Sequence, residues 1–201
     1  MIIHNCMQGS DEWLMLRLGL PTASQFNQFV SAIGKYREGK MPKSYMAQLI
    51  AEDIVTADFD DYSSTWMERG NALEAEAIAE YEIDHNVTCQ RVGCIENDGA
   101  ICSPDALVGN EGLLEVKCPM AKTLILHLMG GDQVVPADYI VQAHGQLVVS
   151  GRQWIDLKIY HPEIDKALEI HTERNEFTQQ VAEHLARFKT DLAATREGLG
   201  L

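Results

Sequence analysis

Positive charge is scarce in this sequence. Its 201 residues include 16 lysines and arginines against 30 aspartates and glutamates, which leaves a formal net charge of −14. This composition excludes the broadly basic surface by which many proteins bind nucleic acids. The shortage is uneven, because residues 1–45 contain five basic and three acidic side chains, whereas residues 46–98 contain two and thirteen. We therefore expect a polyanionic partner to lie against residues 1–45, with residues 46–98 either facing away from it or carrying metal-associated acids such as Glu74.

Long apolar runs and paired cysteines are also missing. The longest apolar stretch, residues 124–129, is interrupted by His127 and is far too short to span a bilayer. The five cysteines form no CxxC pair, which argues against a zinc knuckle or a thioredoxin-like site. The first residues lack the basic and then apolar pattern of a secretory signal. We expect a cytoplasmic protein with reduced cysteines and no membrane partner.

The rest of the composition is typical of one globular domain, with 46% hydrophobic and 23% charged residues. Periodicity predicts helices at residues 10–33 (in two pieces), 44–57, 65–84, 137–150 and 175–197, and strands at residues 87–95, 99–108, 112–118, 154–160 and 166–172. Residues 34–43 are predicted to form a basic loop. The order of elements predicts a mixed α/β fold with a central sheet. A single domain over residues 1–201 would comprise a helical portion (about 1–84), a sheet-bearing core (about 85–175) and a C-terminal helix (about 175–197).

Two predicted elements carry regular polar faces. Residues 154–160 alternate apolar with polar side chains, which predicts a strand with one buried face. Glu76, Glu80 and Glu82 on the acidic helix are expected to be solvated, whereas Glu74 shares a helix face with apolar residues.

The most informative pattern is an SPD motif that ends in Asp105, ten residues before the glutamate of an EVK motif. Glu115 and Lys117 lie two residues apart on a predicted strand, so their side chains share one face. The intervening residues predict a hairpin, and a register with Leu107 opposite Leu113 also sets Asp105 opposite Glu115. This register gathers two carboxylates and an ammonium group at one place.

That grouping has a chemical use. Two close carboxylates repel each other, and they suit a hard divalent cation such as Mg²⁺, which takes oxygen ligands. A lysine beside the cation can orient or deprotonate an attacking water and offset charge in a phosphoryl-transfer transition state. A glutamate and a lysine alone on an exposed strand would be a weak ion pair. Asp105 in the matching register makes the pattern far more specific.

Four segments in this order resemble the lambda-type phage exonucleases, a viral recombinase branch of the PD-(D/E)xK nuclease superfamily. They are residues 13–19 with 22–24, residues 69–74, residues 102–105 with 114–119, and residues 139–142. Together they span most of residues 10–150. The resemblance implies a restriction-endonuclease-like fold, in which helices flank a central mixed sheet.

The resemblance also implies a metal site. Asp105, Glu115 and the backbone carbonyl of Val116 would bind Mg²⁺, with Mn²⁺ as a substitute. Lys117 would act on the nucleophilic water. Glu74 matches a helix glutamate that helps to hold water at the metal.

A second implied site binds phosphates. Arg17, Ser24 and Ser103 match residues that hold the 5′-terminal phosphate, and Gln142 matches a glutamine near the scissile and terminal phosphates. Met67 falls where an apolar wedge parts the strands. The family often carries a second glutamine where His144 stands in this chain, and we expect a supporting or structural role for this histidine.

The implied activity is a metal-dependent 5′→3′ exonuclease on double-stranded DNA that works by two-metal hydrolysis, releases 5′-mononucleotides and leaves 3′ overhangs. The resemblance further implies a ring-shaped homotrimer around DNA and a single-strand annealing protein as partner, in a phage or prophage. By charge alone, the basic residues of the loop region are candidate DNA contacts: Lys35, Arg37, Lys40 and Lys43.

Two alternatives stay open. One is a structure-specific or restriction-type endonuclease with the same metal core, which the 5′-phosphate residues disfavour. The other is a non-catalytic module that binds DNA or recruits a partner, which the intact Asp105, Glu115 and Lys117 disfavour.

Overall fold

Helices and strands follow one another as a mixed α/β fold. The structure is a computed structural model that describes residues 1–55, 65–131 and 135–201, apart from the side chains of residues 65–72. The helices are α1 (Asp11–Arg17), the 3₁₀ helix η1 (Ala23–Gln28), α2 (Lys40–Ile54), α3 (Thr65–His85), α4 (Ala121–Gly130), α5 (Ile140–Ser150) and α6 (Glu176–Leu199). The strands are β1 (Ile2–His4), β2 (Cys89–Gln90), β3 (Cys94–Asn97), β4 (Ala100–Cys102), β5 (Ala106–Val108), β6 (Gly112–Lys117), β7 (Trp154–Ile159) and β8 (Leu168–Glu173).

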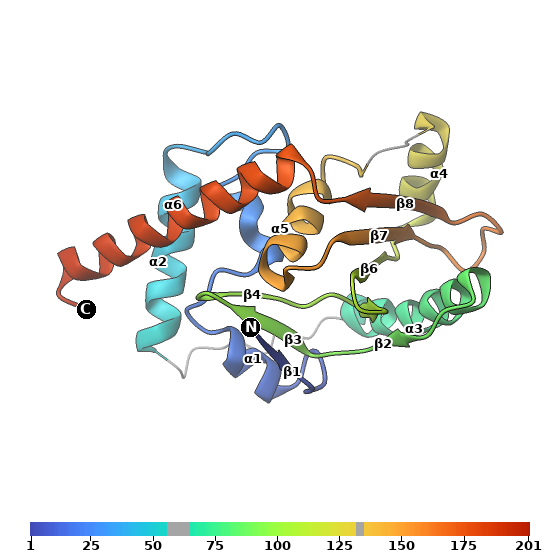
Figure 1. The fold of residues 1–201 in the computed structure, drawn as a ribbon, viewed down its shortest axis with the longest axis horizontal. Helices are drawn as coiled ribbons and strands as arrows, with labels where there is room; N and C mark the ends of the chain where they lie inside the picture. Colours follow the sequence, from blue (N-terminus) through green and yellow to red (C-terminus); the bar gives the residue numbers. More distant parts are fainter. Residues whose placement is uncertain (56–64, 132–134) are drawn as a thin grey trace.

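Two sheets run through the centre of the molecule, and the long α6 crosses α2 at the side opposite α3 and α4 (Figure 1). Strands β1, β3 and β4 form an antiparallel sheet in the order β1-β3-β4. The larger sheet has the order β2-β5-β6-β7-β8. Because β6 and β7 are parallel while their neighbours pair antiparallel, this sheet is mixed, as predicted. Within the described ranges, none of the helices is long and apolar enough to cross a membrane.

Helices cover both faces of the larger sheet. On one face, Ile78 of α3 belongs to a buried cluster with Leu114 of β6. On the other face, Leu147 of α5 belongs to the main core with Leu113 of β6. Successive strand residues point to opposite faces. Glu115 therefore lies on the α5 side of β6.

The predicted hairpin register is confirmed. Leu107 of β5 lies opposite Leu113 of β6. One step before β5, the backbone N–H of Asp105 donates to the carbonyl of Leu114 at 3.1 Å. Asp105 therefore lies at the end of the ladder, next to Glu115.

Close packing fixes α5 against η1. Gly145 of α5 lies so near Phe26 that a Cβ at this glycine would be 2.7 Å from the Phe26 ring. The segment that leads into η1 is tied to β4, because the Ile101 N–H donates to the Pro21 carbonyl at 3.0 Å. Helix α5 ends at its C-cap Gly151, whose positive φ of 67° favours glycine. These contacts set which face of α5 points to β6.

Both faces of β7 are buried, so the prediction of one buried face was wrong. Lys158 is fully buried, and its Nζ lies 2.9 Å from carboxylate oxygens of Glu80 and Glu169. Asp156 accepts a hydrogen bond from the Tyr81 hydroxyl at 2.5 Å. The polar face is covered because α3 and β8 supply partners for its charged groups.

The glutamates of α3 are not merely solvated, contrary to expectation. Glu76 accepts a hydrogen bond from the Tyr160 hydroxyl at 2.7 Å, and Glu82 accepts one from the backbone N–H of Cys89 at 2.6 Å. With Glu80, they join α3 to the sheet.

Several boundaries differ from the prediction. The single strand expected at residues 87–95 is divided into β2 and β3, which belong to different sheets. Gly93 marks the division, since a Cβ there would be 2.6 Å from the Cys6 carbonyl oxygen. Two elements were not predicted: β1, which is only three residues long, and α4, which buries only Leu124 and so shows little periodicity.

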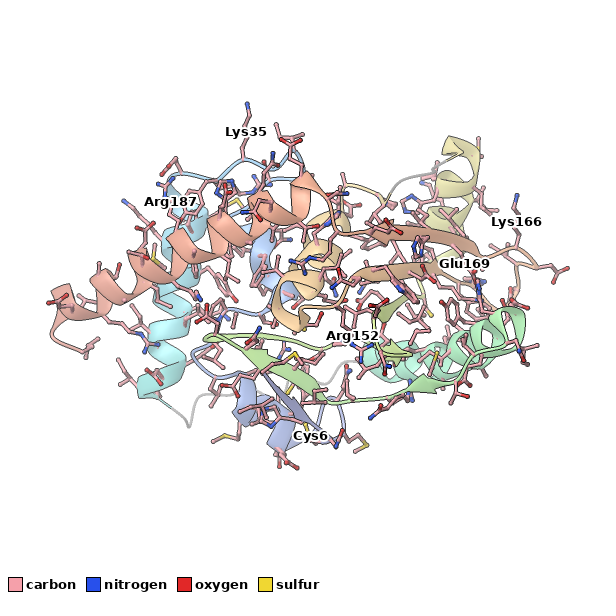
Figure 2. The ribbon with its side chains drawn as sticks, viewed as in Figure 1. Cys6, Lys35, Arg152, Lys166, Glu169 and Arg187 are labelled. Atoms are coloured by element: carbon pink, nitrogen blue, oxygen red, sulfur yellow. The ribbon has the colours of Figure 1, made fainter. Side chains whose placement is uncertain are left out.

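The expected basic loop at residues 34–43 is shorter than predicted, because α2 begins at Lys40. Lys40 and Lys43 are therefore exposed residues of the first turn of α2. Lys35 remains in the loop and points outward (Figure 2). The second piece of the helix expected at residues 10–33 is the 3₁₀ helix η1.

Replacing Gly145 tests the packing that orients α5. We expect Gly145→Ala to lower the free energy of unfolding by about 1–3 kcal/mol, because the fully buried Phe26 ring must move. Gly198→Ala in α6 is a matched control, since no atom lies within 4 Å of its added Cβ. Urea unfolding of both variants measures the difference. Equal effects of the two substitutions would contradict the close approach of α5 to η1.

Candidate active site

The Glu115 carboxylate is the most heavily hydrogen-bonded group of the site. It is 3% exposed. Its Oε1 accepts hydrogen bonds from Lys117 Nζ at 2.6 Å and from Gln142 Nε2 at 2.5 Å. Its Oε2 accepts one from Gln146 Nε2 at 2.6 Å. Donors from β6 and α5 therefore fix this carboxylate in one orientation.

Asp105 lies beside Glu115 at the end of β5. Its Oδ2 accepts a hydrogen bond from the backbone N–H of Val116 at 2.6 Å. The N–H and C=O of one strand residue point to the same side, so the Val116 carbonyl also points to the edge where Asp105 lies. Burial, followed by the charges of Glu115 and Glu74, raises the pKa of Asp105 well above its ordinary value. The three carboxylates are thus close enough to repel one another.

Lys117 carries the compensating charge. Burial alone would lower the pKa of its ammonium group, but the Glu115 and Asp105 carboxylates outweigh this effect and raise the pKa. The side chain also lies over the ring of Tyr139, with Nζ 5.9 Å from the ring centre. In this arrangement Lys117 is a charged donor.

Glu74 reaches the same place from α3. Burial raises the pKa of Glu74, although Arg91 opposes this effect. The Arg91 guanidinium donates to Glu74 Oε1 at 2.6 Å. Glu74, Arg91 and Asp105 line a cavity of about 260 Å³ together with Gln8 and other residues of the N-terminal segment. The site is therefore open to a ligand on the side of Glu74. Arg91 carries no signal in the sequence, because its partner is on another element.

The expected phosphate residues are brought together only in part. Arg17 NH1 donates to the Ser103 hydroxyl at 3.0 Å, and Trp13 Nε1 donates to the same oxygen at 2.9 Å. The Arg17 guanidinium lies 4.1 Å from the centre of the Trp13 ring. Burial lowers the pKa of Arg17. Ser24 is exposed on η1, and among the described residues its hydroxyl contacts that of Thr22 rather than Arg17 or Ser103.

The remaining expected residues divide into three cases. Gln142 is at the site, but it donates to Glu115. His144 shares a hydrogen bond of 2.8 Å with the Thr178 hydroxyl, and burial lowers its pKa to about 4. This contact agrees with the structural role expected for His144. Met67 falls in α3, but its side chain lies outside the described residues.

Sequence reasoning missed Gln146. It is 1% exposed and contacts Glu115 directly. Its position four residues after Gln142 puts both amides on one face of α5. That spacing was the available signal, and the apolar residues around Gln146 concealed it.

The donor set fits one hard divalent cation. Asp105, Glu115 and the Val116 carbonyl offer the oxygen ligands that Mg²⁺ prefers. Among the described residues, no group of three His, Cys, Asp or Glu side chains is close enough to hold a metal ion by itself. Mg²⁺ commonly binds one or two carboxylates and completes its shell with water and substrate phosphates. The site thus suits a cation that is shared with substrate.

A family model of the YqaJ-like viral recombinase domain matches residues 12–153. This part of the chain contains the carboxylates and the residues expected to bind phosphate. The chain belongs to this family. No curated protein matches this YqaJ-like chain. Solved structures do, and they confirm the PD-(D/E)xK fold and the resemblance to lambda-type exonucleases expected from the sequence.

One similar structure is an alkaline exonuclease, LHK-Exo, from Laribacter hongkongensis, which is 28% identical with a TM-score of 0.75. The match covers 95% of this chain and 98% of that one. The same enzyme in complex with dAMP is 29% identical over the same coverage, also with a TM-score of 0.75. A phage-related exonuclease from Haemophilus somnus 129PT shares 12% identity and a TM-score of 0.70, covering 90% of this chain and 96% of that one. At that identity the last match supports the fold alone.

The raised pKa of Asp105 predicts how stability changes with pH. Between its unfolded and folded pKa values the folded protein binds more protons, so stability falls as pH rises from about 4 through the folded pKa. Asp105→Asn keeps the shape and an acceptor for the Val116 N–H, but removes the charge. In EDTA, we expect the variant to melt a few degrees above the wild type at pH 8 and to lose this advantage near pH 4. Thermal melts across this range measure the gap, and a gap independent of pH would contradict the clustering of carboxylates.

Proposed function

We propose that this YqaJ-like protein is a metal-dependent 5′→3′ exonuclease that digests double-stranded DNA, releases 5′-mononucleotides and leaves 3′ overhangs. One observation carries the proposal. Ser103, held by Arg17, lies two residues before Asp105 on the same short connection between β4 and β5. The proposed phosphate-binding residues Arg17 and Ser103 are thereby kept a short, fixed distance from the carboxylates of Asp105 and Glu115. This spacing suits cleavage near the end of a DNA strand. The family and the exonuclease relatives support nuclease chemistry.

Each residue of the centre then has a task. Asp105, Glu115 and the Val116 carbonyl would hold Mg²⁺, or Mn²⁺ in its place. We propose hydrolysis with two divalent cations, which would activate the attacking water and stabilise the leaving oxygen. The Lys117 ammonium would orient the nucleophile and offset charge on the phosphoryl oxygens. Glu74 would accept a hydrogen bond from water on the open side of the cavity.

Gln142 would connect the metal-binding carboxylates with the substrate phosphates. An amide nitrogen has two hydrogens to donate. One is used on Glu115, and the other would contact a substrate phosphate. Met67 is proposed as the apolar wedge that parts the strands ahead of the site.

The residues proposed to bind the 5′-phosphate would set the direction of digestion. Arg17, Ser103 and Ser24 would hold the terminal 5′-phosphate, because a guanidinium and hydroxyls provide several donors to its oxygens. The bond within reach of the carboxylates is then the one after the first nucleotide, so the product is a 5′-mononucleotide. LHK-Exo was solved in complex with dAMP, a product of this type.

The acidic composition bears on assembly. We propose that three copies form a ring around the duplex, since enclosure would replace the broad basic surface that the net charge of −14 excludes. A single-strand annealing protein would receive the exposed 3′ strand during phage-type recombination in the bacterial cytoplasm.

Digestion of a linear 5′-phosphorylated duplex beside a closed circle tests the proposal. With Mg²⁺ and label at either end, we expect mononucleotides from the 5′ ends and an intact circle. Lys117→Ala is expected to reduce the rate at least about 10²-fold while DNA binding persists, because the lost ammonium acts mainly in the transition state. A cut circle would favour the endonuclease alternative. A wild-type protein that binds DNA without cutting it would favour the non-catalytic module.

Arg17→Ala separately tests the proposed binding of the 5′-phosphate. The charged donor contributes roughly 1.5–3 kcal/mol, so the ratio of rates on 5′-phosphorylated and 5′-hydroxyl ends should fall about tenfold or more. Lys35→Ala is the matched control, because this exposed residue points outward from a distant loop (Figure 2). Its ratio should stay at the wild-type value. An undiminished ratio in Arg17→Ala would show that Arg17 does not bind the 5′-phosphate.

A further inference from the structure

We propose that Gln146 is a positioning residue that holds Glu115 from the protein core and so sets the affinity of the site for its divalent cation, without touching DNA. The inference rests on the proposed function in taking Glu115 as a cation ligand. Gln146 lies outside the four segments that resemble the exonuclease family.

The contact is direct and enclosed. Gln146 is 1% exposed, and its Nε2 lies 2.6 Å from Glu115 Oε2. Lys117 and Gln142 both donate to the other oxygen, Oε1. Within the described part of the chain, Gln146 is the donor that holds Oε2. Removing it would leave the carboxylate anchored at one oxygen and free to turn about its last torsion angle.

The orientation of the amide follows from charge. If its oxygen and nitrogen were exchanged, two oxygen atoms would face each other at hydrogen-bond distance, which is repulsive. The nitrogen therefore faces Glu115. Unlike the Lys117 ammonium, this neutral amide fixes the carboxylate without cancelling its negative charge. The hydrogen bond from Gln146 therefore does not reduce the charge that Glu115 presents to a cation.

The other end of the same amide indicates that this residue has a cost. Gln146 Oε1 is buried and has no hydrogen-bond partner among the described residues. An unpaired buried acceptor destabilises a protein, and its neighbours Leu147 and Ala143 are apolar core residues. A leucine would suit this environment better for stability alone. The hydrogen bond to Glu115 is the contact that explains a glutamine here.

The position of Gln146 separates its role from that of Gln142. Gln142 is only half-buried and lies one helical turn closer to the start of α5, where we place the substrate. Gln146 is enclosed by the core and held in place by the packing of the adjacent Gly145 on Phe26. Its loss should therefore change cation binding and leave DNA binding intact.

Two measurements on the full-length protein test this. The first is the dissociation constant for Mn²⁺ without DNA, from electron paramagnetic resonance of the free ion. The second is the affinity for a 5′-phosphorylated duplex in EDTA, from fluorescence anisotropy. We expect Gln146→Leu to weaken Mn²⁺ binding about tenfold or more, as is usual when a group that orients a ligand is lost, with DNA affinity unchanged. Gln146→Met, which is closer in shape, should behave the same and serves if the leucine variant fails to fold.

Val149→Ala is the matched control, because Val149 is a buried residue of the same helix without a hydrogen bond from its side chain to Glu115. It should lower the melting temperature and leave Mn²⁺ binding unchanged. Wild-type Mn²⁺ affinity in both Gln146 variants would overturn the inference, and so would an equal loss of affinity in Val149→Ala. The proposed function would survive either result if the wild type still digests the linear duplex. A wild type that neither binds Mn²⁺ nor cuts DNA would overturn both.

Discussion

Burial of two neighbouring carboxylates is the constraint on which the rest of this structure depends. Asp105 and Glu115 are 9% and 3% exposed, and like charges in such a place must be matched by donors. The donors come from the Val116 backbone, from Lys117 and from two amides of α5. Since two of them belong to α5, that helix has to dock in one rotation and at one height. The tight packing of α5 against η1 holds the helix where its two amides can donate to the buried Glu115 carboxylate.

The same packing couples the carboxylates to the residues that we propose bind the 5′-phosphate. η1 carries Ser24 and contacts both α5 and β4, and β4 leads directly into Ser103. A shift of α5 would therefore move both Glu115's donors and the segment that holds Ser103. Cores are close-packed and deform little, so the two groups keep their separation without a flexible loop between them. A fixed spacing is what an end-specific cut requires.

Sequence patterns anticipated the parts that depend on local repeats. The alternation along β6 and a short hairpin determine that Asp105 lies opposite Glu115, and both were predicted. The contacts of Gln146 and Arg91 were not predicted, because their partners lie 31 and 17 residues away. The four-residue spacing of Gln142 and Gln146 indicates a shared helix face, but it does not identify Glu115 as the partner. The buried face of β7 was misjudged for a related reason. Lys158 looks solvent-exposed until α3 is known to bring Glu80 to it.

The charges of α3 show how an acidic chain can face DNA. Glu76, Glu80 and Glu82 are engaged by the sheet and its connections, so they act as internal partners rather than as a repulsive surface. Glu74 points instead into the cavity beside Asp105, where negative charge attracts cations. These four glutamates of α3 thus serve partly to anchor the helix and partly to add negative charge beside Asp105. Bound cations would reverse the sign of the field at the one place where a phosphate has to approach.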